Sequence, residues 1–358
     1  MTILSLLNDV LSMIKKVFQL LLIFLLFGCL FILSSILIPK DYNIPKPETR
    51  ELIEYWNLKD SSRIAYTHLL PDSNTKPYPI IYLHGGPGGP ISNHHIKSLQ
   101  QLTNWGYEIY LYDQIGNGYS DRLDDISTYT TDRHVKDLEE IITLIGASKV
   151  ILIGHSWGGM LINLFLEKNV SKVSQVIFSS PGPILPINPK LANIPPPDSL
   201  NIQSPHFTNQ KGNHQASNLR SIAMRKCALW WGIKLASDKE ADAFATYLNG
   251  FLNPSTVMDT SLHIPPVFGA GFYSQVMTVK SFRNVPDHRH ILTQVKIPVL
   301  ILKGQYDNQK WGFTNEYAQL YSNHQFIVIP EAGHSIFREQ PELYTQHILN
   351  FLEQQTKN

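Results

Sequence analysis

The distribution of apolar and polar residues divides the chain into an N-terminal segment and a longer remainder. Val17 to Ile38 carries no charged residue and consists mainly of Leu, Ile and Phe. As a helix, this segment would be about 33 Å long at ~1.5 Å per residue, enough to cross a bilayer core of roughly 30 Å. We therefore expect a transmembrane anchor at residues 17–38, after an N-terminal flank at 1–16 and before a Pro- and charge-rich linker at 39–50.

Two other interpretations of the apolar segment stay open, a cleaved or lipidated signal and a buried helix of a soluble protein. A secretory signal usually has a shorter apolar region and a small-residue cleavage site. Leu26-Phe27-Gly28-Cys29 resembles a lipoprotein cleavage box, but Phe27 is bulky and apolar residues continue beyond Cys29. Basic residues flank the segment on both sides, so the side of the membrane on which the remainder lies stays open.

From Leu52 onwards short apolar runs alternate with helical patterns, which predicts an α/β fold, a mostly parallel sheet with helices on both faces. The expected strands are residues 52–56, 63–70, 80–83, 109–112, 150–153, 176–179, 299–302 and 326–329. The first two are expected to form an antiparallel pair. A helix is predicted from Thr131 to Ile145, with Thr130 or Thr131 as its cap and Gly146 after it, and a closing helix at 345–352.

The alternation stops between Pro181 and Ile297. Residues 181–205 are rich in proline, and residues 219–252 are helical in composition. We therefore expect a helical cap at residues 183–296, inserted between two parts of one core at 51–182 and 297–358.

Composition excludes several classes of function. The net charge is +1, so there is no electrostatic footprint for nucleic acid. A disulfide between the two cysteines is not expected, because Cys29 lies in the apolar run. The histidine pairs His94-His95 and His288-x-His290 lack metalloprotease spacing, so no metal or other cofactor is expected. The oligomeric state stays open.

One motif names a candidate nucleophile. Gly154-His155-Ser156-Trp157-Gly158 directly follows the predicted strand at 150–153 and leads into a helical pattern. In Gly-x-Ser-x-Gly a sharp strand-to-helix turn exposes the serine hydroxyl at the edge of the sheet. A serine becomes nucleophilic when an imidazole takes its proton, and a carboxylate must orient that imidazole.

The two partners of Ser156 are expected in the order acid, then histidine. Asp307 follows the predicted strand at 299–302, and His334 follows the strand at 326–329. Both would therefore lie at the edge of the sheet that carries Ser156. We predict a catalytic triad of Ser156, Asp307 and His334. His155 is expected to pack beneath the turn.

The reaction also requires donors for the oxyanion. One is predicted to be the backbone N–H of Trp157, directly after the nucleophile. The other is predicted to be the N–H of Gly86, in the turn His84-Gly85-Gly86-Pro87-Gly88-Gly89.

These motifs together resemble the prolyl iminopeptidase family of α/β-hydrolases. They are His84-Gly85-Gly86-Pro87-Gly88-Gly89, Asp113-Gln114-x-Gly116-x-Gly118-x-Ser120, Ser156-Trp157-Gly158 and Gly304-x-Tyr306-Asp307. The likeness runs from about Leu52 to the C-terminus and is weakest across the insertion. It implies an α/β-hydrolase without metal that removes an N-terminal residue, often proline, from short peptides beneath a helical cap.

The chain departs from the family pattern at two places. Ile115 stands where the family has an arginine after Asp113-Gln114, so a charge that orders this loop is missing. The resemblance also implies a cap acid, within Trp-Glu-Gly, for the free ammonium of the substrate, but this chain has Trp230-Trp231-Gly232. The candidate substitutes are Asp238, Glu240, Asp242 and Asp259. Trp230 and Trp231 either line the substrate pocket or pack within the cap.

The expected function is therefore that of a membrane-anchored serine hydrolase that cleaves an N-terminal residue of the proline type from short peptides through an acyl-enzyme, its partner being a small peptide or small acyl substrate. An esterase, amidase or lactonase with the same triad is the enzymatic alternative. A non-catalytic, membrane-anchored binding protein on a hydrolase fold is the alternative from another class, and the loss of a triad residue would be its sign.

Overall fold

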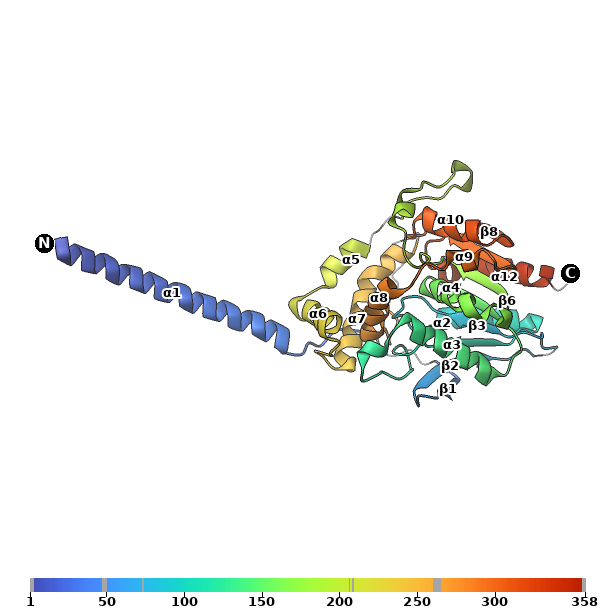
Figure 1. Cartoon of the computed structure of the whole chain (residues 1–358), viewed down its shortest axis with the longest axis horizontal. Helices are drawn as coiled ribbons and strands as arrows, with labels where there is room; N and C mark the ends of the chain where they lie inside the picture. Colours follow the sequence, from blue (N-terminus) through green and yellow to red (C-terminus); the bar gives the residue numbers. More distant parts are fainter. Residues whose placement is uncertain are drawn as a thin grey trace.

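The computed structural model describes residues 3–46, 50–72, 74–205, 207, 209–259 and 265–355. Helix α1 runs without interruption from Ile3 to Leu37 and projects away from the rest of the molecule (Figure 1). The predicted flank and the predicted span therefore belong to one helix within the described residues. Its stretch Val10–Leu37 is long and apolar enough to cross a membrane, with a mean hydropathy of 2.9. Residues 47–49 of the predicted linker and 356–358 of the predicted core lie outside the described residues.

The remainder is built on an eight-stranded sheet with the order β1-β2-β4-β3-β5-β6-β7-β8. Its strands are β1 (Ile53–Asn57), β2 (Arg63–Leu69), β3 (Ile80–Leu83), β4 (Ile109–Tyr112), β5 (Val150–His155), β6 (Val173–Ser179), β7 (Val299–Gly304) and β8 (His324–Ile329). Strand β2 pairs antiparallel with β1 and with β4. All pairings from β4 to β8 are parallel. The predicted α/β class and the predicted antiparallel opening are confirmed.

Helices cover both faces of the sheet, and each face has its own apolar core. The helices outside the insertion are α2 (Asn93–Gln100), α3 (Thr131–Ile145), α4 (Trp157–Asn169), α10 (Trp311–Leu320), α11 (Ile336–Glu339) and α12 (Pro341–Gln355), with short 3-10 turns at Gln101–Trp105, Ile126–Thr128 and Val170–Lys172. Side chains of α3, α4 and α10 pack on one face. Side chains of α2, α11 and α12 pack on the other. The hydroxyl of Thr130 caps α3 by accepting the N–H of Arg133, as predicted.

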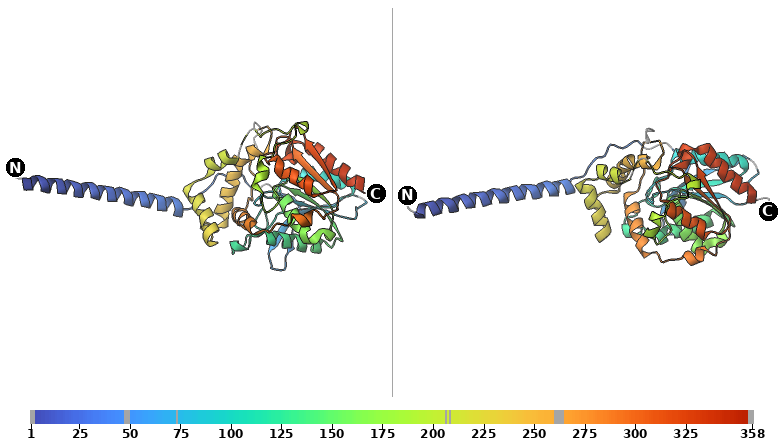
Figure 2. Two further views of the ribbon diagram at one scale, coloured as in Figure 1. Left: turned by 45° about the horizontal axis from the view of Figure 1, so that its top comes forward. Right: turned by 90° about the horizontal axis from the view of Figure 1, so that it is seen from above.

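The chain between β6 and β7 holds the segment that we expected to be a cap. Its helices are α5 (Asn209–Ala216), α6 (Leu219–Trp231), α7 (Asp238–Leu252), α8 (Phe272–Ser281) and α9 (Arg289–Leu292), and its 3-10 turns are Pro189–Asn193, Asp198–Leu200, Asn253–Thr256 and Phe282–Asn284. The stretch predicted as helical, 219–252, is two helices, because α6 ends at Gly232 with a φ of 67°. Helices α5 to α7 lie on the side of the molecule from which α1 projects (Figures 1 and 2).

Candidate active site

Ser156 lies at a strained turn between β5 and α4. Its backbone has φ 55° and ψ −113°, a left-handed conformation that residues other than glycine rarely adopt. Close packing explains the neighbouring glycine at 158, since a Cβ there would lie 2.0 Å from the carbonyl oxygen of Leu83. A Cβ at Gly154 would likewise lie 2.6 Å from the backbone of Gly158. The turn thus has the form that Gly-x-Ser-x-Gly predicts.

His334 and Asp307 lie in hydrogen-bond contact, although 26 residues separate them in the chain. The Nδ1 of His334 is 2.7 Å from the Oδ1 of Asp307, and the carboxyl side chain is fully buried. Because a carboxylate only accepts, Nδ1 carries the proton and donates it. This leaves Nε2 as the basic nitrogen of the ring, the arrangement that a general base requires.

Lys303 is a buried partner of Asp307 that sequence reasoning missed. Its Nζ donates to the Oδ2 of Asp307 at 3.0 Å and to the carbonyl of Gln309 at 2.8 Å, and its side chain is fully buried. Burial alone would raise the pKa of the Asp307 carboxyl, but the charge of Lys303 and the hydrogen bond from His334 hold that pKa well below its usual value. The sequence held one signal for this contact, a lone lysine at the end of an apolar strand and four residues before the acid.

The glycine-rich turn after β3 lies against the serine. A Cβ on Gly85 would be 3.1 Å from the Cβ of Ser156, and Gly86 has a φ of 128° that favours glycine. Trp157 is the first residue of α4, where backbone N–H groups have no partner inside the helix. Within the described part of the chain, no hydrogen bond occupies the N–H of Gly86 or that of Trp157. Both N–H groups predicted as oxyanion donors are therefore available.

Gln114 joins this turn to the serine turn. Its backbone N–H donates to the Nε2 of His84 at 2.9 Å, and its Oε1 accepts the indole N–H of Trp157 at 2.7 Å. Burial lowers the pKa of His84, which therefore stays neutral and donates through Nδ1 to the carbonyl of Gly85. The sequence motif contained Gln114, but its role depends on partners that lie far from it along the chain.

His155 packs beneath the turn, as expected. Its Nε2–H donates to the carbonyl of His334 at 3.1 Å, which helps to fix the loop that carries the base. Burial lowers the pKa of His155 to about 3, so the ring stays neutral. It supplies packing and one hydrogen bond.

A cavity of about 320 Å³, here called the serine cavity, opens over these residues. Ser156, His334 and Gly86 line it, whereas Asp307 and Trp157 lie behind its surface. Six of the other lining residues have carboxamide side chains: Asn209, Asn249, Asn253, Gln275, Asn308 and Gln309. Among the described residues that line it, none is Asp or Glu, and Arg338 adds a positive charge.

Three of the four candidate cap acids, Asp238, Glu240 and Asp242, line a different cavity, of about 850 Å³, which we call the linker cavity. Asp238 pairs with Lys234 at 2.7 Å, and Glu240 pairs with Arg220 through two carboxylate oxygens. The remaining candidate, Asp259, directly precedes residues 260–264, which lie outside the described residues.

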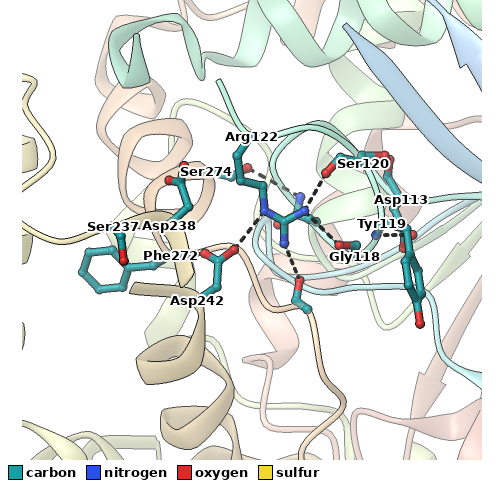
Figure 3. Close-up of polar contacts among 12 residues, drawn as sticks. Asp113, Gly118, Tyr119, Ser120, Arg122, Ser237, Asp238, Asp242, Phe272 and Ser274 are labelled. Carbon is teal, nitrogen blue, oxygen red and sulfur yellow. Dashed lines mark hydrogen bonds and ion pairs between the residues drawn. The ribbon is translucent and has the colours of Figure 1, made fainter. Parts of the chain in front are cut away.

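Asp242 joins the cap to the core. Its Oδ2 accepts the Nε–H of Arg122 at 2.8 Å, while the Nη1 of Arg122 donates to the carbonyls of both Gly118 and Ser120 (Figure 3). Its Oδ1 accepts the N–H of Phe272 at 3.0 Å. The carboxylate thus links α7 to the turn that follows β4.

The loop after β4 has a charged partner in spite of Ile115. Arg50, at the end of the linker, is buried, and its Nη1 lies 2.8 Å from the Oδ2 of Asp113. Asp113 also accepts the N–H groups of Ile91 and Tyr119. The positive charge that orders this loop therefore comes from Arg50, outside the motif. Sequence reasoning missed this contact.

Trp230 and Trp231 do not line the serine cavity. Their side chains are 65% and 66% exposed, so neither packs inside the cap. Both interpretations considered for these residues are wrong.

Comparison with known proteins identifies the family. A profile described as alpha/beta hydrolase fold matches residues 78–341. The chain is 27% identical over 286 residues to the proline iminopeptidase of Heyndrickxia coagulans, a match that covers 78% of this chain and 92% of that protein. A stretch of 102 residues is 39% identical to the proline iminopeptidase of Saccharolobus solfataricus, covering 28% of this chain and 32% of that protein. The resemblance inferred from the motifs is confirmed.

Solved structures agree on the fold. An esterase from Thermogutta terrifontis aligns with a TM-score of 0.60 at 17% identity, covering 84% of this chain and 98% of that one. A proline iminopeptidase from Mycobacterium smegmatis aligns with a TM-score of 0.55 at 19% identity and the same coverage. At such identities the likeness concerns the fold alone. The chain belongs to the alpha/beta hydrolase fold family.

Proposed function

We propose that this hydrolase is a serine hydrolase that works through an acyl-enzyme. The observation that carries the proposal is the hydrogen bond between His334 and Asp307 at the cavity that Ser156 also lines. The Nε2 of His334 takes the proton of Ser156 as the hydroxyl oxygen attacks the substrate carbonyl. The N–H groups of Gly86 and Trp157 hold the resulting oxyanion, and losing one such donor costs about 3 kcal/mol of transition-state stabilisation.

The same imidazole completes the cycle. His334 returns its proton to the leaving group, so that the acyl group stays on Ser156 as an ester. His334 then removes a proton from a water molecule, which attacks this ester and releases the acid. Asp307 and Lys303 keep the imidazole in one tautomer and orientation throughout.

The proposed reaction is the removal of an N-terminal residue of the proline type from short peptides. Support comes from the similarity to the proline iminopeptidase of Heyndrickxia coagulans, which extends over most of both chains. The carboxamides that line the serine cavity offer acceptors and donors for peptide groups.

One observation favours a second candidate, an esterase, amidase or lactonase with the same machinery. A substrate ammonium that enters the serine cavity would meet no carboxylate from the described lining residues. Moving an ammonium out of water without an anionic partner costs several kcal/mol. A substrate without a free amine avoids this cost.

The nucleophile is tested by labelling with a fluorophosphonate probe. We expect Ser156→Ala to abolish labelling. The denaturant midpoint of its unfolding should equal that of the wild type, which shows that the fold is intact. The matched control is Ser335→Ala, because Ser335 lines the same cavity. This control should still be labelled. Labelling that survives in Ser156→Ala would remove Ser156 from its role, and a wild-type chain that is never labelled would favour the non-catalytic binding protein.

A substrate panel decides between the two reactions. We expect the full-length enzyme to hydrolyse a proline arylamide and to reject its N-acetylated analogue if it acts on N-terminal residues. Equal rates on both arylamides, or faster hydrolysis of short acyl esters, would favour the second candidate. The Ser156→Ala variant provides the background rate for each substrate.

We also propose that α1 is an uncleaved membrane anchor. The support is its length and its apolar surface, which is not buried against the rest of the molecule. The protein should stay with the membrane after alkaline extraction, and its N-terminal peptide should still be present by mass spectrometry. Recovery of a chain shortened within α1 would show a cleaved signal instead.

A further inference from the structure

Exposed apolar and basic side chains lie along one side of α6 and at its C-terminal end. This surface, here called the α6 face, consists of Leu219, Ile222, Lys226, Trp230, Trp231 and Ile233. The first four recur at spacings of three and four residues and so lie on one side of the helix. The opposite side, with Arg220, Met224 and Ala228, is buried. The apolar side chains of the α6 face are 44–66% exposed.

Hydrogen bonds tie α6 to the end of α1. The Nη1 of Arg220 donates to the carbonyl of Ile36 at 2.5 Å. Glu240, the carboxylate partner of Arg220, also accepts the backbone N–H of Lys40 at 2.9 Å. Ile36 lies two residues before Ile38, where the apolar segment ends, which is about 3 Å along a helix. Helix α6 is therefore held at the level where the apolar surface of α1 ends.

Helix α6 is oriented as a helix on a membrane surface would be if α1 crossed that membrane. In Figure 1, α1 lies in the plane of the picture, whereas α6 is seen nearly end-on beside its end. The two helices therefore cross, and if α1 spans a bilayer, α6 runs along the bilayer surface. Amphipathic helices at membrane interfaces have this geometry, with basic residues and with tryptophan at the level of the headgroups. The Nζ of Lys226 lies 5.2 Å from the ring centroid of Trp230.

We propose that the α6 face lies in the headgroup region of the phospholipid bilayer that α1 crosses. This inference rests on α1 being an anchor, as proposed above. A bilayer surface fits because the tie between Arg220 and Ile36 fixes the position of α6 relative to the apolar segment. It also fits because Arg225 and Lys226 on exposed parts of α6 would be attracted to anionic lipids. The protein is thereby attached to the membrane at two places, a spanning helix and a surface helix.

Tryptophan fluorescence of the full-length protein tests the proposal. Helix α1 contains no tryptophan, so lipid quenching reports on the rest of the molecule. The protein is reconstituted into phosphatidylcholine–phosphatidylglycerol vesicles with brominated acyl chains and compared with the same vesicles without bromine. Because two of the six tryptophans lie on the α6 face, we expect bromine to reduce the emission by about a third.

The variants decide which residues are quenched. We expect the double variant Trp230→Phe, Trp231→Phe to lose the quenching, while the control Trp105→Phe keeps it. Trp105 is 54% exposed on the turn after α2, outside the α6 face. Quenching that survives in the double variant overturns the proposal, as does unquenched emission from protein that floats with the vesicles. Protein that does not float overturns the anchor and the α6 face together, while fluorophosphonate labelling tests the catalytic proposal independently.

Discussion

The serine cavity and the linker cavity use carboxylates in opposite ways. The serine cavity has no Asp or Glu among its described lining residues, and Asp307, the partner of His334, is fully buried and does not line it. The linker cavity is lined by four acids, Asp41, Asp238, Glu240 and Asp242, together with Arg122 and Arg220. At the serine cavity, a carboxylate orients an imidazole. In the linker cavity, carboxylates hold α7 to the turn after β4 and to the linker, and Arg220, the partner of Glu240, holds the end of α1.

This contrast limits what the resemblance implies. The family pattern places cap acids at the amine of the substrate, but Glu240 and Asp242 are occupied by Arg220 and Arg122. Releasing either acid would leave a partly buried arginine without its partner, which is costly. The insertion between β6 and β7 is therefore organised around the linker and α1, and its described residues contribute carboxamides and other uncharged side chains, but no acid, to the serine cavity.

The largest effect is expected from Asp307→Asn. An asparagine amide would donate to Nδ1 of His334, which moves the ring proton to Nε2 and prevents that nitrogen from accepting the proton of Ser156. By analogy with the serine protease triad, we expect kcat to fall by about 10⁴-fold with little change in KM. Steady-state kinetics on the best substrate of the panel measures this. A kcat within tenfold of the wild type would show that the Asp307–His334 hydrogen bond is not part of the mechanism.

Lys303→Met tests the buried charge on the other side of Asp307. Removing one partner of a buried ion pair costs about 3–5 kcal/mol of unfolding free energy. Lys172→Met is the matched control, because the pair of Lys172 with Glu139 is exposed and should contribute less than about 1 kcal/mol. Denaturant unfolding of both variants measures the difference. Equal small losses would show that the Lys303–Asp307 pair stabilises no more than a surface pair.

The pH dependence of the same variant has a defined sign. The folded-state pKa of Asp307 is depressed, so its contribution to stability is present above the pKa of the unfolded chain and is lost as the pH falls through the folded value. Without Lys303 the folded pKa rises, so less stability should be lost on acidification, and the loss should be complete at a higher pH than in the wild type. Identical acid unfolding profiles would contradict the assignment of Lys303 as the charge that depresses this pKa.

Gly86→Ala tests the oxyanion turn. A Cβ at this position would lie 2.1 Å from the backbone nitrogen of Gly88, so the turn must move and misplace the N–H of residue 86. We expect kcat to fall by about 10²–10³-fold, as for the loss of one oxyanion donor. Gly146→Ala is the control, because its φ is also positive but the added Cβ meets open space after α3. That variant should lose some stability and keep its kcat.

The elements around the serine cavity were predictable because their sequence signals are local. The strands Ile80–Leu83 and Ile109–Tyr112 were predicted with their observed bounds, since buried parallel strands are continuous apolar runs between turns. Strand β6 begins at Val173, earlier than predicted, because polar Ser174 and Gln175 interrupt the apolar run at its start. The pairing of Asp307 with His334 followed from the order of residues at strand ends.

The partners of buried charges were not predictable, because they are set by packing between distant segments. Lys303 resembles a turn lysine, and nothing in the sequence of the linker shows that Arg50 reaches Asp113. The same holds for the cap, where helix composition predicted α6 and α7 but not the pairing of Asp242 with Arg122 across 120 residues. The residues that line the linker cavity form no repeating pattern in the sequence, so this cavity was not predictable.

The smallest effect is expected from Asp242→Asn, which tests the contrast between the cavities directly. Burial raises the pKa of Asp242 to about 6 in spite of the adjacent Arg122. The folded state therefore binds a proton more tightly than the unfolded state, and this residue makes stability fall as the pH rises from about 4 to about 6. Asparagine cannot titrate, so the variant should lose this decrease in stability, which is about 3 kcal/mol for a pKa difference of about two units, measured by unfolding across that range. Hydrolysis of the proline arylamide at pH 7 should stay within about twofold of the wild type, because Asp242 faces the linker cavity. If KM instead rises tenfold for the free amine and stays constant for its acetylated analogue, Asp242 binds the substrate, and the separation of the two cavities fails.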